Sequence, residues 1–187
     1  MKKIILTLLL MTTFVNAQVK YVDFTINGFV NAENPNQDYI VIDFEGKTQK
    51  ELYNSFSTYF TTEFISVKDV INSVENETIT ITALSDKAVE YGKTRVRQKY
   101  DLYYNIQFLF KDEKVRINMP NILALYDEGG SDLKIYMERN DMSLYPTIFN
   151  VDKTVRSQYS INSLENFFNK EINEVVKLVK SDENKNW

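Results

Sequence analysis

The sequence predicts an α+β fold in which two amphipathic helices cover one face of an antiparallel sheet. Residues 100–110 and 115–119 both alternate apolar and polar side chains, and a short polar turn, residues 111–114, separates them. Such alternation around a short turn is typical of a β-hairpin that is buried on one face. Residues 48–62 and 162–180 instead repeat apolar side chains at helical spacing, so each segment predicts a helix that covers this apolar face.

The first predicted elements are a strand and a capped helix. Residues 38–44 alternate and end at Gly46, which predicts a strand. Thr48 and Glu51 match the capping box, in which a hydroxyl and a carboxylate each bind a backbone N–H group at the start of a helix. The helix over residues 48–62 therefore follows the strand directly.

The remaining elements complete the order β-α-β-β-β-β-α. Residues 70–74 and 78–84 predict two strands, whereas residues 85–92 are ambiguous between a helical turn and a loop. Pro120 ends the central hairpin because it has no N–H group to donate. Residues 122–126 and 133–137 predict an accessory hairpin, and Asn162 is the expected cap of the last helix. The apolar stripe of that helix is Leu164, Phe167, Phe168, Ile172, Val175, Val176 and Val179.

The N-terminus carries the features of a secretory signal peptide. Lys2 and Lys3 precede an apolar run, and the small residue Ala17 stands where a signal peptidase would cut. This predicts a signal peptide over residues 1–17, an exported protein that is periplasmic or extracellular, and no transmembrane segment. An N-terminal core strand or helix is the alternative interpretation.

Removal of 17 residues leaves 170, which fits one domain. We expect an N-terminal extension over residues 18–37, a single domain over residues 38–181 with an insertion at about 120–160, and a disordered tail over residues 182–187. A chain from Gln37 to Ser181 is therefore expected to keep the fold.

Composition excludes several classes of function. Without Lys2 and Lys3 the chain has 20 basic and 26 acidic residues, a net charge of −6, which argues against nucleic acid as a partner. The chain has no histidine and no cysteine, so catalytic triads, Cys-His dyads and thiolate zinc sites are excluded. We expect no cofactor and no metal site. Residues 127–132 carry three carboxylates, but their spacing favours a turn over a calcium loop.

One stretch of the chain resembles a known family. Residues 38–46 (DYIVIDFEG) and 47–53 (KTQKELY) are similar to the opening of a family of exported bacterial proteins, a domain of unknown function with a TBP-like fold. That fold corresponds to one half of the TATA-binding protein. The resemblance covers residues 39–119 best, and residues 121–159 are longer than it implies. It implies a fold and an export route, and it brings no catalytic residues and no DNA binding.

Two surfaces are candidates for binding. Lys93, Arg95, Arg97 and Lys99 alternate before the central hairpin and form a basic strip for an anionic partner. The alternative is a solvated face whose charges discourage edge-to-edge pairing of strands. The second candidate is the sheet face away from the helices, for which the alternative is an ordinary solvated side of an antiparallel sheet. Its members are Tyr39, Thr80, Thr82, Tyr103, Asn105, Gln107, Arg116 and Asn118.

These features favour a non-enzymatic exported domain that binds a protein or an envelope component through its open sheet face. A second hypothesis is a carboxylate-dependent hydrolase of cell-envelope polymers, with Asp43, Glu45 or Asp101 as its acids. It would need two carboxylates that converge in a pocket. A third is a homodimer formed through the same sheet face.

Overall fold

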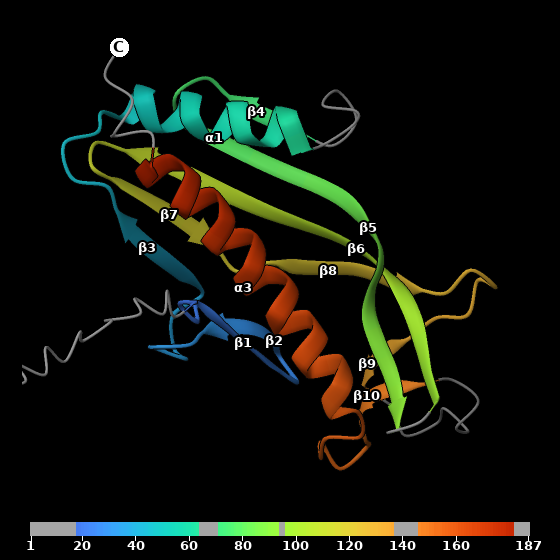
Figure 1. Cartoon of the computed structure of the whole chain (residues 1–187). Helices are drawn as coiled ribbons and strands as arrows, with labels where there is room; N and C mark the ends of the chain where they lie inside the picture. The colour runs from blue at the N-terminus through green and yellow to red at the C-terminus, as the bar shows by residue number, and fades with distance from the viewer. Residues whose placement is uncertain (1–17, 64–70, 94–95, 137–145, 182–187) are drawn as a thin grey trace, which may run out of the picture.

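The computed structural model describes residues 18–63, 71–93, 96–136 and 146–181 of the chain. A twisted sheet forms one layer, and both helices lie on one of its faces, which confirms the predicted α+β architecture (Figure 1). The described elements are, in chain order, β1 (Val22–Thr25), β2 (Gly28–Asn31), β3 (Tyr39–Asp43), α1 (Gln49–Glu63), β4 (Ile71–Val74), β5 (Thr78–Lys93), β6 (Val96–Lys111), β7 (Lys114–Asn118), β8 (Asn121–Tyr126), β9 (Lys134–Tyr136), β10 (Thr147–Phe149) and α3 (Gln158–Ser181).

The central sheet has the strand order β3-β7-β6-β5-β4, with antiparallel pairing at every step. Its centre is the hairpin of β6 and β7, in which Phe108 pairs with Ile117 and Phe110 with Val115. All four of these side chains are buried. The predicted hairpin and its buried face are thus confirmed, because successive side chains of a strand point to opposite faces.

β5 is longer than the sequence predicts. The ambiguous residues 85–92 continue this strand to Lys93, around an irregularity between Ser85 and Val89. Lys87 lies in this irregularity with a φ of 52°. A bulge inserts unpaired residues and interrupts the alternation of a strand, so the sequence pattern is lost there.

β8 lies in the main sheet, and the accessory hairpin predicted for residues 122–126 and 133–137 is wrong. β7 pairs with the last residues of β6, and β8 pairs with residues 101–105 of the same strand. Pro120 lies between β7 and β8 and has no N–H group to donate to β6. The chain that pairs with β6 on this side is therefore divided into two strands. β9 pairs in parallel with β10, and one bridge joins Tyr126 to Asp132.

α1 begins with the predicted capping box. The Glu51 N–H donates to Thr48 Oγ1 at 3.3 Å, and the Thr48 N–H donates to the Glu51 carboxylate at 2.8 Å. The helix then packs on the sheet through Phe56, whose ring centroid lies 5.6 Å from that of Phe108 and 5.3 Å from that of Phe110. Local capping and long-range aromatic packing together fix α1 over β6 and β7.

α3 begins at Gln158, earlier than the predicted start at Asn162. Its cap is the buried Ser157, whose Oγ accepts a hydrogen bond from the Ser160 N–H at 3.3 Å. Asn162 is exposed within the helix. The predicted apolar stripe is confirmed, and its buried members are Leu164, Phe168, Ile172, Val175, Val176 and Val179.

The predicted N-terminal extension contains the hairpin of β1 and β2, which packs on α3 (Figure 1). Val22 and Phe29 of this hairpin are buried in the core. Asn169 of α3 is buried beside them, and its Oδ1 accepts hydrogen bonds from the N–H groups of Tyr21 and Val22 at 2.6 and 3.0 Å. Its Nδ2 donates to the Val22 carbonyl at 3.0 Å. The hairpin is therefore part of the domain.

Asn169 is the middle member of a ladder of side chains on α3. One turn before it, the Glu165 carboxylate accepts a hydrogen bond from the Phe24 N–H at 3.0 Å. One turn after it, Asn173 accepts from the Val19 N–H at 3.2 Å and donates to the Val19 carbonyl at 2.7 Å. Four residues of a helix rise about 6 Å, and two residues of a strand rise about 6.6 Å. Side chains one turn apart on α3 therefore reach every second residue of the extended chain beside them.

The predicted signal peptide, residues 1–17, and the predicted tail, residues 182–187, lie outside the described residues. Across the ranges that the structure describes, neither helix is both long enough and apolar enough to cross a bilayer.

Glu171 lies on α3 at a small cavity of about 20 Å³ that Phe60 and Tyr104 also line. Burial raises the pKa of Glu171 above that of an ordinary carboxyl, and repulsion by Glu174 adds to this effect. Lys170 opposes the increase. An ionised carboxylate in this position therefore destabilises the fold.

Deletion of residues 18–37 should abolish cooperative unfolding, contrary to the expectation from sequence that this segment is dispensable. It removes Val22, Phe24 and Phe29 from the core. Burial of each such side chain contributes about 1.5–3 kcal/mol, and their sum is comparable to the whole stability of a domain, about 5–15 kcal/mol. Thermal unfolding followed by circular dichroism tests this. A chain that ends at Ser181 is the control, and equal melting of both truncated chains would contradict the prediction.

Asn169→Ala should lower the free energy of unfolding by about 2–3 kcal/mol, because it leaves buried backbone groups of β1 without partners. Urea unfolding monitored by circular dichroism measures this change. Asn166→Ala, at an exposed position of the same helix, is the matched control and should change stability by less than about 0.5 kcal/mol. The same loss in both variants would show that the ladder does not hold β1.

Glu171→Gln should raise the melting temperature at pH 7. A carboxyl whose pKa is higher in the folded chain destabilises the fold as pH rises above its unfolded pKa, so this penalty is present at neutral pH. The difference from wild type should vanish by about pH 4, where the unfolded carboxyl is also largely protonated. Melting curves at both pH values check this, with the exposed Glu45→Gln as control. A gain that persists at low pH would refute the explanation.

Candidate binding surface

The face of the central sheet opposite the helices is formed by every second residue of its strands. Tyr104, Ile106 and Phe108 of β6 are buried, so the residues between them point to the other face. Both helices lie on the buried side, and this second face lies behind the sheet in Figure 1. We name it the open face. The strand registers place all eight predicted residues there: Tyr39, Thr80, Thr82, Tyr103, Asn105, Gln107, Arg116 and Asn118.

Five side chains form one connected row across the open face, which we name the polar row. The Arg116 guanidinium lies over the Tyr39 ring, with its Cζ 3.8 Å from the centroid, and its Nε donates to Asn118 Oδ1 at 2.9 Å. Asn118 Nδ2 donates to Gln107 Oε1 at 2.8 Å, and Gln107 Nε2 donates to Thr80 Oγ1 at 3.3 Å. The row runs from β3 through β7 and β6 to β5, about 14 Å at the usual strand spacing. Each bond fixes the orientation of the next group.

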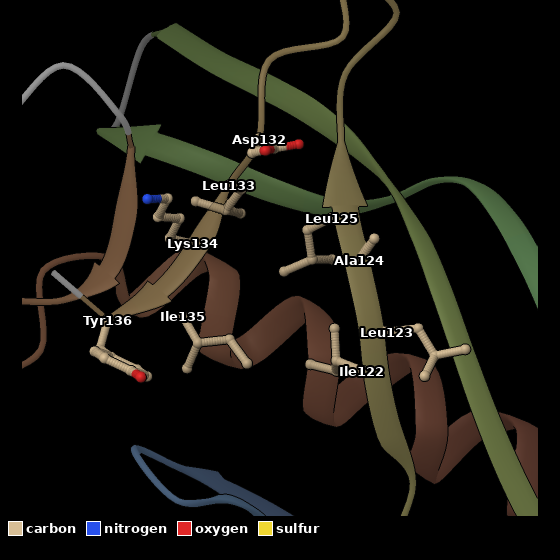
Figure 2. A pocket seen from close by; sticks show the side chains of 9 residues that line it. All are labelled: Ile122, Leu123, Ala124, Leu125, Asp132, Leu133, Lys134, Ile135 and Tyr136. Atoms are coloured by element: carbon tan, nitrogen blue, oxygen red, sulfur yellow. The ribbon is translucent and has the colours of Figure 1, made fainter. Parts of the chain in front are cut away.

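Leu84, Tyr103 and Leu123 form an apolar patch further along the open face. Tyr103 pairs with Leu84 in β5 and with Ala124 in β8. An irregularity in β8 turns Leu123 and Ala124 to the same side of the strand (Figure 2). The exposed fractions of Leu84, Tyr103 and Leu123 are 54%, 39% and 42%. Neither Leu84 nor Leu123 is among the residues predicted from sequence for this face. Leu84 alternates with the threonines of β5, which would have placed it there, whereas no alternation reveals Leu123.

The four residues of the predicted basic strip differ in their surroundings. Arg97 forms an ion pair with Glu90 at 2.6 Å, and its guanidinium lies 4.5 Å from the centroid of the Tyr159 ring. An arginine with these two partners has fewer groups left for an anionic ligand. Lys99 is exposed. The side chain of Lys93 and the whole of Arg95 lie outside the described residues.

Two of the three carboxylates of the hydrolase hypothesis, Asp43 and Asp101, lie far apart. Asp43 lies at the end of β3 and pairs with Lys114, which in turn pairs with Lys111 of β6. Asp101 lies ten residues from Lys111 along β6, about 33 Å at the usual rise of a strand. Glycosidases place their two carboxyl groups within about 10 Å of each other. Asp43 and Asp101 therefore do not form such a pair.

Residues 127–132 form the predicted turn. Asp127 Oδ1 accepts hydrogen bonds from the N–H groups of Gly129 and Ser131, at 2.9 and 2.7 Å. These bonds hold the pKa of Asp127 below its ordinary value, with the Ser131 N–H as the largest cause. Within the described ranges, no group of three or more acidic side chains is arranged to hold a metal ion.

A groove of about 380 Å³ lies between β8 and β9, and no sequence pattern predicts it (Figure 2). Ile122 and Leu125 point toward it from β8, Ile135 lines it from β9, and Leu133 lines it from just before β9. Most of its lining is aliphatic. Sites for small molecules add several converging polar groups that orient the ligand. The polar row has such groups, so the open face is the candidate site.

The chain is similar to solved structures of one fold. A TBP-like protein from Parabacteroides distasonis is 14% identical, with a TM-score of 0.53 over 76% of this chain and 90% of the other. A DUF4468 family protein from Bacteroides ovatus is 12% identical, with a TM-score of 0.50 over 76% of this chain and 84% of the other. At these identities the similarity shows the fold alone. A comparison with curated proteins gave no match.

A family model agrees with the fold and with the resemblance seen in the sequence. It is described as a domain of unknown function (DUF4468) with TBP-like fold, and it matches residues 39–123. The match runs from the first residue of β3 into β8, so it includes α1, the central hairpin and the whole polar row. Residues 39–123 therefore match the model of the DUF4468 family, and the fold of the chain is TBP-like.

Proposed function

We propose that the chain is an exported, non-enzymatic binding domain whose open face contacts a protein of the cell envelope. The polar row carries this proposal, because it presents oriented amide, hydroxyl and guanidinium groups on a face that neither helix covers. The apolar patch lies on the same face. Buried apolar anchors beside oriented polar groups are the usual composition of a protein interface.

Two features of the sequence support the remaining parts of this proposal. The predicted signal peptide favours a periplasmic or extracellular location. The net charge of −6 after its removal opposes binding to the phosphates of nucleic acid, so the name of the fold does not imply DNA as the partner. A second copy of the chain remains an alternative partner for the open face.

The variant Leu84→Ser/Tyr103→Ser should lose the envelope partner. Apolar anchors at the centre of an interface contribute about 1–2 kcal/mol each, so binding should weaken at least about tenfold. Quantitative mass spectrometry after capture from a Bacteroides envelope extract, followed by titration with the purified partner, measures this. Tyr136→Ser/Leu178→Ser is the matched control, because it makes the same changes at exposed positions elsewhere.

Equal capture by the two variants would contradict the proposal. Sedimentation of the purified wild type tests the alternative partner in the same experiment. A wild-type dimer that the variant Leu84→Ser/Tyr103→Ser dissociates would identify a second copy of the chain as the partner of the open face.

A further inference from the structure

Three cations lie together at one end of the open face, which we name the basic end: Lys111, Lys114 and Arg116. Lys111 of β6 pairs directly with Lys114 of β7, and Arg116 follows Lys114 by two residues, so all three share one face. Both lysines are exposed. Like charges that are directly opposite in a ladder destabilise it. This arrangement costs stability in the free protein, and an anionic partner would offset that cost.

The two acidic residues between these lysines do not neutralise them. The Asp112 carboxylate accepts a hydrogen bond from the Gln49 N–H at 2.8 Å, and the Glu113 carboxylate accepts one from the Gly46 N–H at 3.1 Å. Both carboxylates are thus directed to the backbone before and at the start of α1. Asp43 pairs with Lys114 across the ladder, but no ion pair of 4 Å or less joins it to the basic end within the described residues.

Arg116 is held in an orientation suited to a carboxylate. Its Nε is bonded to Asn118 and its plane lies over Tyr39, so the side chain is fixed from two directions. Its two terminal NH2 groups have no hydrogen bond to another described residue. A guanidinium with a free edge binds a carboxylate with two parallel hydrogen bonds, and prior orientation reduces the entropy lost on binding.

The apolar patch identifies the class of macromolecule. Arg116 pairs with Leu109, which lies six residues along β6 from Tyr103, about 20 Å. One face therefore presents cations at one end and exposed leucines at the other. A polyanion such as nucleic acid or a sugar polymer has few aliphatic groups for the leucines to pack on, whereas a protein segment has both apolar and acidic side chains.

We infer that the open face binds an acidic protein segment, with its carboxylates on the basic end and its apolar side chains on the apolar patch. This inference rests on the proposed function and names the chemistry of the partner. Charge complementarity across such an interface accelerates association and selects acidic partners over neutral ones. The net charge of −6 over residues 18–187 repels acidic molecules in general, so a local cluster of cations is needed to bind one.

A defined peptide tests the inference without knowledge of the natural partner. The peptide has ten residues, with Val and Thr alternating in one half and Glu and Thr in the other, and a second peptide has Gln in place of each Glu. Each is titrated into ¹⁵N-labelled protein of residues 18–187, and amide chemical shifts are recorded by NMR. The acidic peptide should shift amides of β5, β6 and β7, and should bind at least about tenfold more tightly than the Gln peptide.

Variants separate the basic end from charge in general. Lys111→Ser/Lys114→Ser should weaken binding of the acidic peptide about tenfold, whereas the charge-matched control Lys50→Ser/Lys177→Ser should bind like wild type. Arg116→Lys keeps the positive charge and loses the planar guanidinium. Its affinity for the acidic peptide should therefore lie between that of wild type and that of Lys111→Ser/Lys114→Ser. Each variant spectrum first confirms that the fold is kept. Binding should also weaken as salt rises, because exposed ion pairs are screened.

Each other outcome overturns the inference, and the outcomes differ in what they imply for the proposed function. Equal binding of both peptides to the open face would refute the role of carboxylates and leave the open face as a protein-binding surface. Chemical-shift changes confined to α1 or α3 would count against both the inference and the proposed function. No shift at millimolar peptide would refute the inference alone. Lysine-dependent binding to vesicles of anionic lipid, without binding of the acidic peptide, would assign the basic end to a membrane surface.

Discussion

Burial of a single apolar face of the sheet by two helices is the constraint on which the rest of the structure depends. Phe56 of α1 reaches β6 at Phe108, and Phe168 of α3 reaches the same strand at Tyr104, with ring centroids 5.6 and 5.1 Å apart. A chain without cysteine has no disulfide to replace this packing. Because both helices are needed on one side, the other side of the sheet has no covering element among those described, and its residues are available for contacts with other molecules.

The elements that the sequence predicts correctly are those fixed by local patterns. Thr48 and Glu51 lie three residues apart and bind each other whatever the rest of the chain does. The misplaced start of α3 involves Ser157 and Asn162, which are both favourable caps, and only the burial of Ser157 decides between them. Asn169 resembles any polar residue of a helix surface, because the strand that it binds lies 147 residues away along the chain. Long-range partners of this kind leave no local signal.

The same contrast between local patterns and long-range partners applies to the candidate site. Alternation alone places Arg116 and Gln107 on the open face, since a side chain's face depends only on its parity within the strand. Which of these side chains touch each other depends on strand order, and the contact between Arg116 and Tyr39 exists because β3 pairs with β7. The ring contact of Arg97 is equally hidden, because Tyr159 belongs to α3. Sequence therefore predicts which residues a surface contains better than how they are connected.

The ladder on α3 has a consequence for how the chain folds. The hydrogen bonds that hold Val19, Tyr21, Val22 and Phe24 join residues 141–154 positions apart. Contacts of such high sequence separation incur a large loop-closure entropy, so they form late and slow the folding rate. β1 can pair with β2 as soon as both are synthesised, but the side chains of α3 that bind β1 are absent until that last helix has formed. Synthesis order and folding order are thus reversed at the N-terminus, and its apolar residues stay exposed until the C-terminal helix is complete.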